Sequence, residues 1–329
     1  MKRMKCFTSA ACSMNCPNAR IEAFDEYYGY GVAEDAGYKK IKCKDCMYNT
    51  GKCEDCLFFN SEDCAKNKKK KKNMVNSMLY ITGDCHGDFS KLSNKYFSEQ
   101  RSLTKEDIVI ICGDFGGIWG SASTKFEEYW LKWLDNRNFT TVFIDGNHEN
   151  FQRLNNDFEV VQFYGGRAHK ISNTVFHLIR GEVYNIQSKK IFTFGGAQSH
   201  DVQDGILCRE DFRTEYLFKE AIRKYRHQRK AFRIKDISWW PEELPAEVEI
   251  NNANKNLVLN NYEVDYIITH CAPYDIAKQL RFDANNILTQ YFNTLVNQLK
   301  FKHWYFGHYH EDIDIGNFSL LYKRIIRLG

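Results

Sequence analysis

The sequence has no apolar run long enough to cross a membrane. A membrane-spanning helix needs about 18 or more consecutive apolar residues, and no such run occurs among these 329 residues. The N-terminal stretch MKRMKCFTSAAC has the basic start and small residues of a signal peptide, but its apolar part is too short and too polar. We therefore expect a cytoplasmic protein without a membrane partner.

Most of the chain also lacks an excess of either charge. Residues 1–73 hold 15 Lys and Arg against 10 Asp and Glu, whereas the remaining 256 residues hold 31 against 32. The net charge of +4 therefore belongs to the N-terminal segment, and the near-neutral body does not favour a nucleic-acid partner. With 43% hydrophobic residues, the chain is long enough for one large core and an appendage.

Cysteine is scarce after residue 65, because eight of the 12 cysteines precede it. Clustered thiols in a reducing compartment bind metal more readily than they form disulfides. The stretch CKDCMYNTGKCEDC (43–56) holds two CxxC pairs, and we expect them to bind a structural zinc ion through Cys43, Cys46, Cys53 and Cys56. The pairs are closer together than in the usual zinc ribbon, so an iron–sulfur or redox role and disulfides remain alternatives. Four more cysteines form a second site or stay free: Cys6, Cys12, Cys16 and Cys64.

These patterns divide the chain into three parts. Residues 1–65 form a Cys-rich zinc-binding module, 66–77 a lysine-rich solvated linker, and 78–329 the body. Within the body, DIVIICG (107–113) and TTVFIDG (140–146) are typical of strands, and 124–138 is typical of a helix. Alternating strands in 175–194 and from 305 onward predict a second sheet, so we expect a mixed α/β sandwich flanked by helices. The predicted helix places three aromatic residues on its apolar face: Phe126, Trp130 and Trp133.

Residue types that bind metals follow several predicted strands. In GDCHGD (83–88), Asp84 and His86 would point to the same side of an extended chain. A capping Asp beside an unrelated His explains this stretch equally well on its own. Four more strand ends carry such residues, so that five of the ten histidines lie beside glycines or carboxylates. They occur in GDFGG with Asp114, GNHEN with Asn147 and His148, ITHCAP with His270, and YFGHYH with His308 and His310.

In this order, the motifs GDxH, GD, GNHE, TH and GHxH resemble the calcineurin-like metallophosphoesterase superfamily over residues 78–329, in its bacterial branch. The resemblance implies a helix-flanked β-sandwich and a metal-dependent phosphoesterase with a two-metal mechanism. It implies that Asp84, His86 and His310 hold one metal. It implies that Asn147, His270 and His308 hold the other, and that Asp114 bridges the two.

Such mixed ligands suit divalent cations, and we expect two manganese ions, with iron or zinc as alternatives. Two cations about 3.5–4 Å apart can hold both oxygens of an in-line displacement. A bridging hydroxide would be the nucleophile. His148 follows the predicted ligand Asn147 without being needed as a ligand itself, so we interpret it as the general acid.

The chain departs from the phosphoprotein phosphatases of this superfamily, which continue the second motif as GDxxDRG and precede the third with Arg. Gly117, Ile118 and Asp145 occupy those positions here. The usual carboxylate that orients the acid and two phosphate-binding arginines are therefore missing, which disfavours the alternative of a serine/threonine protein phosphatase. Asp88 or Asp145 is a candidate to orient His148 instead.

An insertion at about 202–236 is basic, with ten Lys and Arg against six Asp and Glu. Its cations steer an anionic substrate or are simply solvated. Trp239 and Trp240 follow it, and either pack in the core or stack on substrate. The insertion also has a helical apolar stripe: Leu217, Phe218, Ala221, Ile222 and Tyr225.

Two classes of function fit the sequence. The first is a phosphoesterase acting on a small phosphorylated metabolite or nucleotide. The second is a nucleic-acid-binding protein or nuclease, in which the Cys-rich module and the lysine linker recognise the nucleic acid. The sequence carries no signal for the oligomeric state.

Overall fold

A computed structural model describes residues 77–282 and 284–329, and Ser77–Gly329 forms one compact unit. The predicted zinc-binding module (1–65) and nearly all of the predicted linker (66–77) lie outside the described residues. No helix of the described part has the length and hydropathy that a membrane crossing requires.

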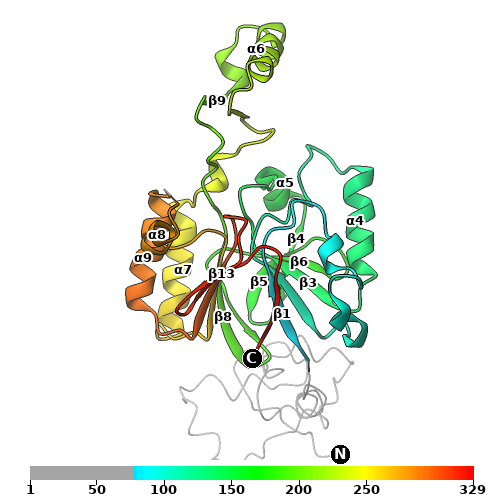
Figure 1. The fold of residues 1–329 in the computed structure, drawn as a ribbon, viewed down its shortest axis with the longest axis vertical. Helices are drawn as coiled ribbons and strands as arrows, with labels where there is room; N and C mark the ends of the chain where they lie inside the picture. Colours follow the sequence, from blue (N-terminus) through cyan, green and yellow to red (C-terminus); the bar gives the residue numbers. More distant parts are fainter. Residues whose placement is uncertain (1–76, 283) are drawn as a thin grey trace, which may run out of the picture. The chain divides into compact units, whose positions relative to one another are not determined.

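Two sheets make up the body (Figure 1). Neighbouring strands of the first sheet follow the order β15-β1-β2-β3-β6-β5-β4, and those of the second follow β13-β14-β12-β11-β8-β7. The first sheet contains β1 (Leu79–Thr82), β2 (Ile108–Ile111), β3 (Thr140–Phe143), β4 (Glu159–Phe163), β5 (Gly166–Lys170), β6 (Val175–Leu178) and β15 (Ile325–Leu328). The second contains β7 (Val183–Ile186), β8 (Lys189–Phe194), β11 (Tyr266–Thr269), β12 (His303–Phe306), β13 (Ile313–Ile315) and β14 (Phe318–Leu320).

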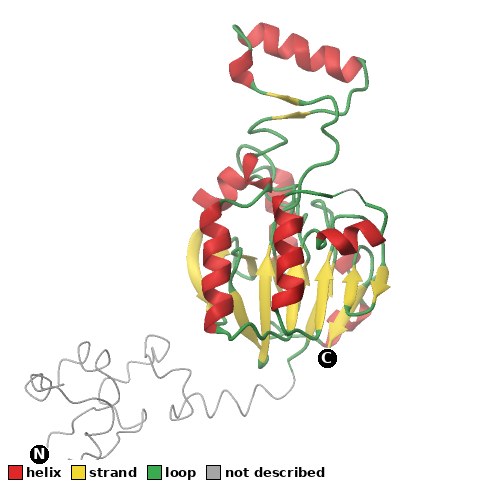
Figure 2. Ribbon diagram, turned by 90° about the vertical axis from the view of Figure 1, so that its left-hand side faces the viewer, coloured by secondary structure: helices red, strands yellow, loops and turns green. Residues whose placement is uncertain are grey.

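Helices of the body pack on the outer faces of the two sheets, and Figure 2 shows those in front of one sheet, with the helix of the insertion lying apart from both. The α-helices are α4 (Lys125–Asp135), α5 (Phe151–Asn156), α6 (Glu215–His227), α7 (Glu247–Leu259), α8 (Tyr274–Gln279) and α9 (Ile287–Gln298). Short 3₁₀ helices span Ser90–Leu92, Ser98–Ser102, Arg209–Asp211 and Pro241–Glu243. Helix α4 begins where the Thr124 side chain accepts a hydrogen bond from the Glu127 amide, as expected for an N-cap threonine.

Strand alternation distributes the apolar side chains over three layers. On β1, Leu79 and Ile81 enter the core between the sheets, whereas Tyr80 faces the layer that contains α4. On β11, Ile268 enters the same inter-sheet core and Ile267 packs in the layer formed with α7 and α9. Strands buried on both faces consist of continuous apolar residues, which is why β2 reads IVII.

The predicted mixed α/β sandwich is confirmed, with two local corrections. Strands β6 and β15, expected in the second sheet, pair with β3 and β1 of the first. On α4, Trp130 and Trp133 pack against the core, but Phe126, in the first turn of the helix, is 61% exposed.

The insertion (202–236) forms a small unit of its own, drawn above the sheets in Figure 1. Strands β9 (Ile206–Leu207) and β10 (Arg233–Ile234) pair in parallel, and α6 lies between them in sequence. Leu207, Phe218 and Ile234 are its buried core. Leu217 was wrongly predicted to join this apolar stripe and is 48% exposed.

Candidate metal centre

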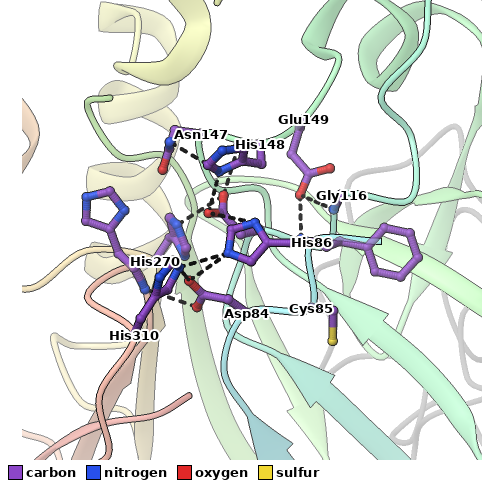
Figure 3. Close-up of polar contacts among 12 residues, drawn as sticks. Asp84, Cys85, His86, Gly116, Asn147, His148, Glu149, His270 and His310 are labelled. Carbon is purple, nitrogen blue, oxygen red and sulfur yellow. Dashed lines mark hydrogen bonds and ion pairs between the residues drawn. The ribbon is translucent and has the colours of Figure 1, made fainter. Parts of the chain in front are cut away.

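The predicted site residues meet at the carboxyl ends of five strands. Strands β1, β2 and β3 are parallel neighbours in one sheet, and β11 and β12 are parallel neighbours in the other. Side chains that follow such strands converge on one edge, as in other open α/β sheets. Figure 3 shows Asp84, His86, Asn147, His148, His270 and His310 directed toward one another there.

Asp84 and His86 reach this edge by a different route from the one predicted. The strand ends at Thr82, so the two residues lie in the following turn rather than in extended chain. His86 has a left-handed backbone, with φ of 49°. Asp114, His308 and His310 also have positive φ, at 45°, 73° and 55°. Non-glycine residues adopt this conformation at a cost, and such strain gathers at functional sites.

The ligand-type atoms form two groups that share one carboxylate. In each group these atoms lie within 4.8 Å of one another: Asp84, His86, Asp114 and His310 in the first, and Asp114, His270 and His308 in the second. Asp84 Oδ2 is 3.1 Å from His310 Nε2, and Asp114 Oδ1 is 3.2 Å from His270 Nε2. The structure thus brings together six of the seven predicted ligands in these two groups, with Asp114 common to both.

Glycines at the strand ends allow this close approach. A Cβ atom added at Gly113 would collide with the His270 ring, and one added at Gly307 would collide with the Asp84 carboxylate. Gly113 also has a φ of 87°, which favours glycine. Each of these motifs therefore requires glycine because the ligands of the other sheet pack against its backbone.

The shared carboxylate sets the electrostatics of the centre. Burial would raise the pKa of Asp114, but the imidazoles of His270 and His148 hold it well below its usual range. Burial would lower the pKa of His270, but the Asp114 carboxylate raises it to about 9. For His308, burial and the neighbouring His270 lower the pKa well below the usual range. The centre therefore attracts positive charge.

Ten buried side-chain atoms of the described residues have no hydrogen-bond partner, and three of them belong to predicted ligands: Asp84 Oδ2, Asn147 Oδ1 and His270 Nε2. The other ends of two of these side chains are fixed. His270 Nδ1 lies 2.7 Å from the carbonyl oxygen of Cys112, and Asn147 Nδ2 donates to Ser199 Oγ at 3.3 Å. An imidazole held by its second nitrogen is typical of a metal ligand. These oxygen and nitrogen donors fit divalent transition metals.

His148 stands at the edge of the two groups without belonging to either. Its side chain is 33% exposed, and its Nδ1 lies 2.8 Å from Asp114 Oδ2. Its Nε2 lies 3.0 Å from Nη2 of Arg233 in the insertion. Neither candidate for orienting His148 contacts it: Asp88 accepts from the Ser90 amide, and Asp145 pairs with His177 and Arg180.

The neighbours of Asn147 form a buried chain that the sequence did not reveal. Ser199 Oγ contacts Asn147, and Glu243 accepts from both the amide and the hydroxyl of Ser199, at 2.9 and 2.8 Å. Burial raises the pKa of Glu243 to about 7. Glu149, also buried, accepts from the backbone amides after Asp114. Only the tertiary fold brings Ser199 and Glu243 to this motif, from positions 52 and 96 residues after Asn147 in the sequence.

Trp240 does not form a platform for substrate at the centre. Trp240 is 1% exposed and packs edge-to-face on Trp119, which in turn lies 5.6 Å from the His148 ring. Core packing is therefore the correct interpretation for Trp240.

Comparison with known proteins agrees with this geometry. The model of the family described as calcineurin-like phosphoesterase matches residues 78–312. The chain belongs to the calcineurin-like phosphoesterase family. It is also similar to lariat debranching enzyme A of Xenopus laevis, with 24% identity over 175 residues. That match covers 48% of this chain and 30% of the relative, so the chain spans less than a third of the length of that enzyme.

Proposed function

We propose that this calcineurin-like phosphoesterase hydrolyses a phosphate ester with two divalent cations. Asp84, His86 and His310 would hold one cation, Asn147, His270 and His308 the other, and Asp114 both. The observation that carries the proposal is the pair of ligand groups that share Asp114. Manganese is the first expectation, with iron or zinc as alternatives, since all three accept mixed oxygen and nitrogen ligands.

When bound, the cations would supply a hydroxide nucleophile near neutral pH and stabilise the charge that develops on the phosphoryl oxygens. The chain's own residues complete the site. The Asp114 carboxylate accepts a hydrogen bond from the backbone amide of His148 through Oδ1, and its Oδ2 lies beside Nδ1 of the His148 ring, both at 2.8 Å. The partly exposed His148 ring would protonate the leaving oxygen, which is the task of a general acid.

A pocket of about 540 Å³ supports a small phosphorylated metabolite or nucleotide as the substrate. This volume lies within the usual range for small-molecule sites, about 300–1,000 Å³. Its lining includes the polar or cationic side chains of Gln198, His200, Arg281 and Asn285. Two of the predicted ligands, His308 and His310, also line it. A phosphate bound at the metal centre would leave room here for the rest of the molecule.

The test is turnover of a panel of phosphomonoesters and phosphodiesters, with and without added manganese. We expect manganese-dependent hydrolysis of at least one small ester. Absence of hydrolysis of every ester by metal-loaded protein would contradict the proposal. Faster hydrolysis of the monoesters or of the diesters would identify the substrate class.

Nucleic-acid cleavage is the second candidate, favoured by a basic stripe on α6. Lys219, Arg223 and Arg226 are exposed and spaced so that they share one face of this helix. Their nearby carboxylates, Glu215 and Glu220, form only surface ion pairs, which stabilise little. The similarity to a lariat debranching enzyme points in the same direction.

Binding of a single-stranded oligonucleotide at several salt concentrations tests this candidate. For three phosphate contacts, the triple variant K219E/R223E/R226E should reduce the salt slope by about two. Its turnover of a small ester should stay unchanged. An unaltered slope would exclude the stripe as a nucleic-acid contact.

A further inference from the structure

Arg233 is a buried arginine supplied by the insertion to the metal centre. It forms strand β10 with Ile234, and adjacent residues of a strand point to opposite sides. Ile234 accordingly packs in the core of the insertion, whereas Arg233 points toward the third motif and is only 6% exposed. The two-residue strand thus places the Ile234 side chain in the insertion and the Arg233 side chain beside the metal centre.

The guanidinium of Arg233 is held by contacts on several sides. Its Nε donates to Asp201 Oδ1 at 2.7 Å, and its Nη1 donates to the carbonyl oxygens of Ser238 at 3.0 Å and Asn147 at 3.2 Å. Its Nη2 lies 3.0 Å from His148 Nε2. Four of the five hydrogens that an arginine can donate are therefore engaged. Few donors remain for substrate, which favours a role in holding other residues.

The contact with His148 also defines the state of that ring. Arginine has donors only, so His148 Nε2 must accept. In a neutral ring the hydrogen is then on Nδ1, which donates to Asp114 Oδ2 at 2.8 Å. The ring is thereby held between Asp114 and Arg233 with its one hydrogen on Nδ1. In the proposed reaction the leaving oxygen would receive that hydrogen in place of Asp114 Oδ2, which the cations would bind. The Asn147 carbonyl beside the ring is held by the same guanidinium.

We propose that Arg233 is the positioning residue for His148, and that the insertion completes the catalytic site by supplying it. The inference rests on the proposed function, in which His148 is the proton donor. Arg233 takes the place of a carboxylate that would orient the acid, since Asp88 and Asp145 are engaged elsewhere. A planar fork that binds an imidazole, two carbonyls and a carboxylate at once has no equivalent in a lysine ammonium.

The experiment is a double-mutant cycle on the full chain, measured with the ester that the wild type turns over. R233A should lower kcat by about 10–100-fold, as is common when the support of an active-site residue is lost. In the H148A background the same change should lower kcat by less than about twofold, because Arg233 acts through His148. Metal content by elemental analysis should be the same in R233A and wild type.

R213A is the matched control, because Arg213 lies exposed in the same insertion and makes no side-chain hydrogen bond or ion pair with the described residues. It should retain full turnover. R233K serves if R233A does not fold, and it should remain slower than wild type by at least about fivefold. Thermal unfolding of each variant checks that the fold is intact.

Equal losses from R233A in the wild-type and H148A backgrounds would overturn the inference and indicate that Arg233 acts on substrate or structure directly. Full activity of R233A in a wild type that hydrolyses esters would also overturn it, while leaving the proposed function intact. A wild type that binds metal but hydrolyses no ester would instead remove the proposed function.

Discussion

His86 Nε2 lies 2.8 Å from His310 Nε2, although 224 residues separate them in sequence. Both nitrogens also face Asp84 Oδ2, at 3.7 and 3.1 Å. Each histidine adopts a left-handed backbone, which costs about 1–2 kcal/mol for a residue with a side chain. The fold retains this strain at both positions because it brings three ligand-type atoms to one point.

His148→Ala tests the proposed acid. Because His148 lies outside both ligand groups, the variant should retain the metals of the wild type. Hydrolysis should slow by roughly 10²–10⁴-fold, the usual contribution of general acid catalysis. Esters with good leaving groups need no proton and should be affected least, which steady-state kinetics on a leaving-group series would show.

His227→Ala is the control for that variant, since His227 is exposed on α6 and should be dispensable. An equal slowing of good and poor leaving groups by His148→Ala would argue against proton donation.

The Cys-rich module is predicted to fold around zinc and to be dispensable for chemistry. Removal of residues 1–65 should leave turnover of a small ester nearly unchanged, because no predicted ligand of the metal centre lies there. Replacing Cys43 and Cys46 by Ser should reduce bound zinc by about one ion per chain, measured by elemental analysis. Unchanged zinc would exclude this CxxC pair, and loss of turnover on truncation would show that the module contributes to the site.

The ion pair of Glu127 and Arg153 should stabilise the helices beside the centre. It is bidentate, with both distances 2.8 Å, and it connects α4 to α5, the helix that follows the third motif. Arg153→Leu leaves the buried Glu127 without its partner and should cost about 3–5 kcal/mol of unfolding free energy in urea. The double variant E127L/R153L should recover most of that loss. A single variant as stable as the wild type would mean that the pair contributes nothing.

A buried histidine away from the centre should make stability depend on pH. Burial, followed by the neighbouring His177, lowers the pKa of His169 to about 4, against an ordinary value of 6.5. The folded state therefore binds fewer protons than the unfolded state between these values, and stability falls as the pH drops from 6.5 toward 4. Asp145 and Arg167 are the other charged groups that act on it.

His169→Gln removes this proton uptake but keeps a polar neighbour for His177. Its unfolding free energy, measured by denaturant titration between pH 7 and 4, should therefore fall less steeply than that of the wild type. Parallel curves would show that His169 does not titrate in this range.

The sequence predicted the two sheets and the order of the motifs because both depend on local patterns. Continuous apolar strands such as β2 and glycines before Asp114 and His308 can be recognised without tertiary information. The left-handed turn at His86 could not be predicted, because an extended chain would also place Asp84 and His86 on the same side. The role of Arg233 could not be predicted either, because nothing in the local sequence distinguishes it from the other nine cations of the insertion. Its role depends on a tertiary contact with His148, which lies 85 residues earlier in the sequence.

The central claim is that one carboxylate joins two metal sites, and Asp114→Asn tests it most directly. Elemental analysis of the full chain should show about two fewer transition-metal ions per chain in the variant than in the wild type. The difference cancels any zinc bound by the Cys-rich module. Asp88→Asn, which changes an exposed carboxylate in the loop after β1, should retain the wild-type metal content. Equal metal content in Asp114→Asn and wild type would contradict the account.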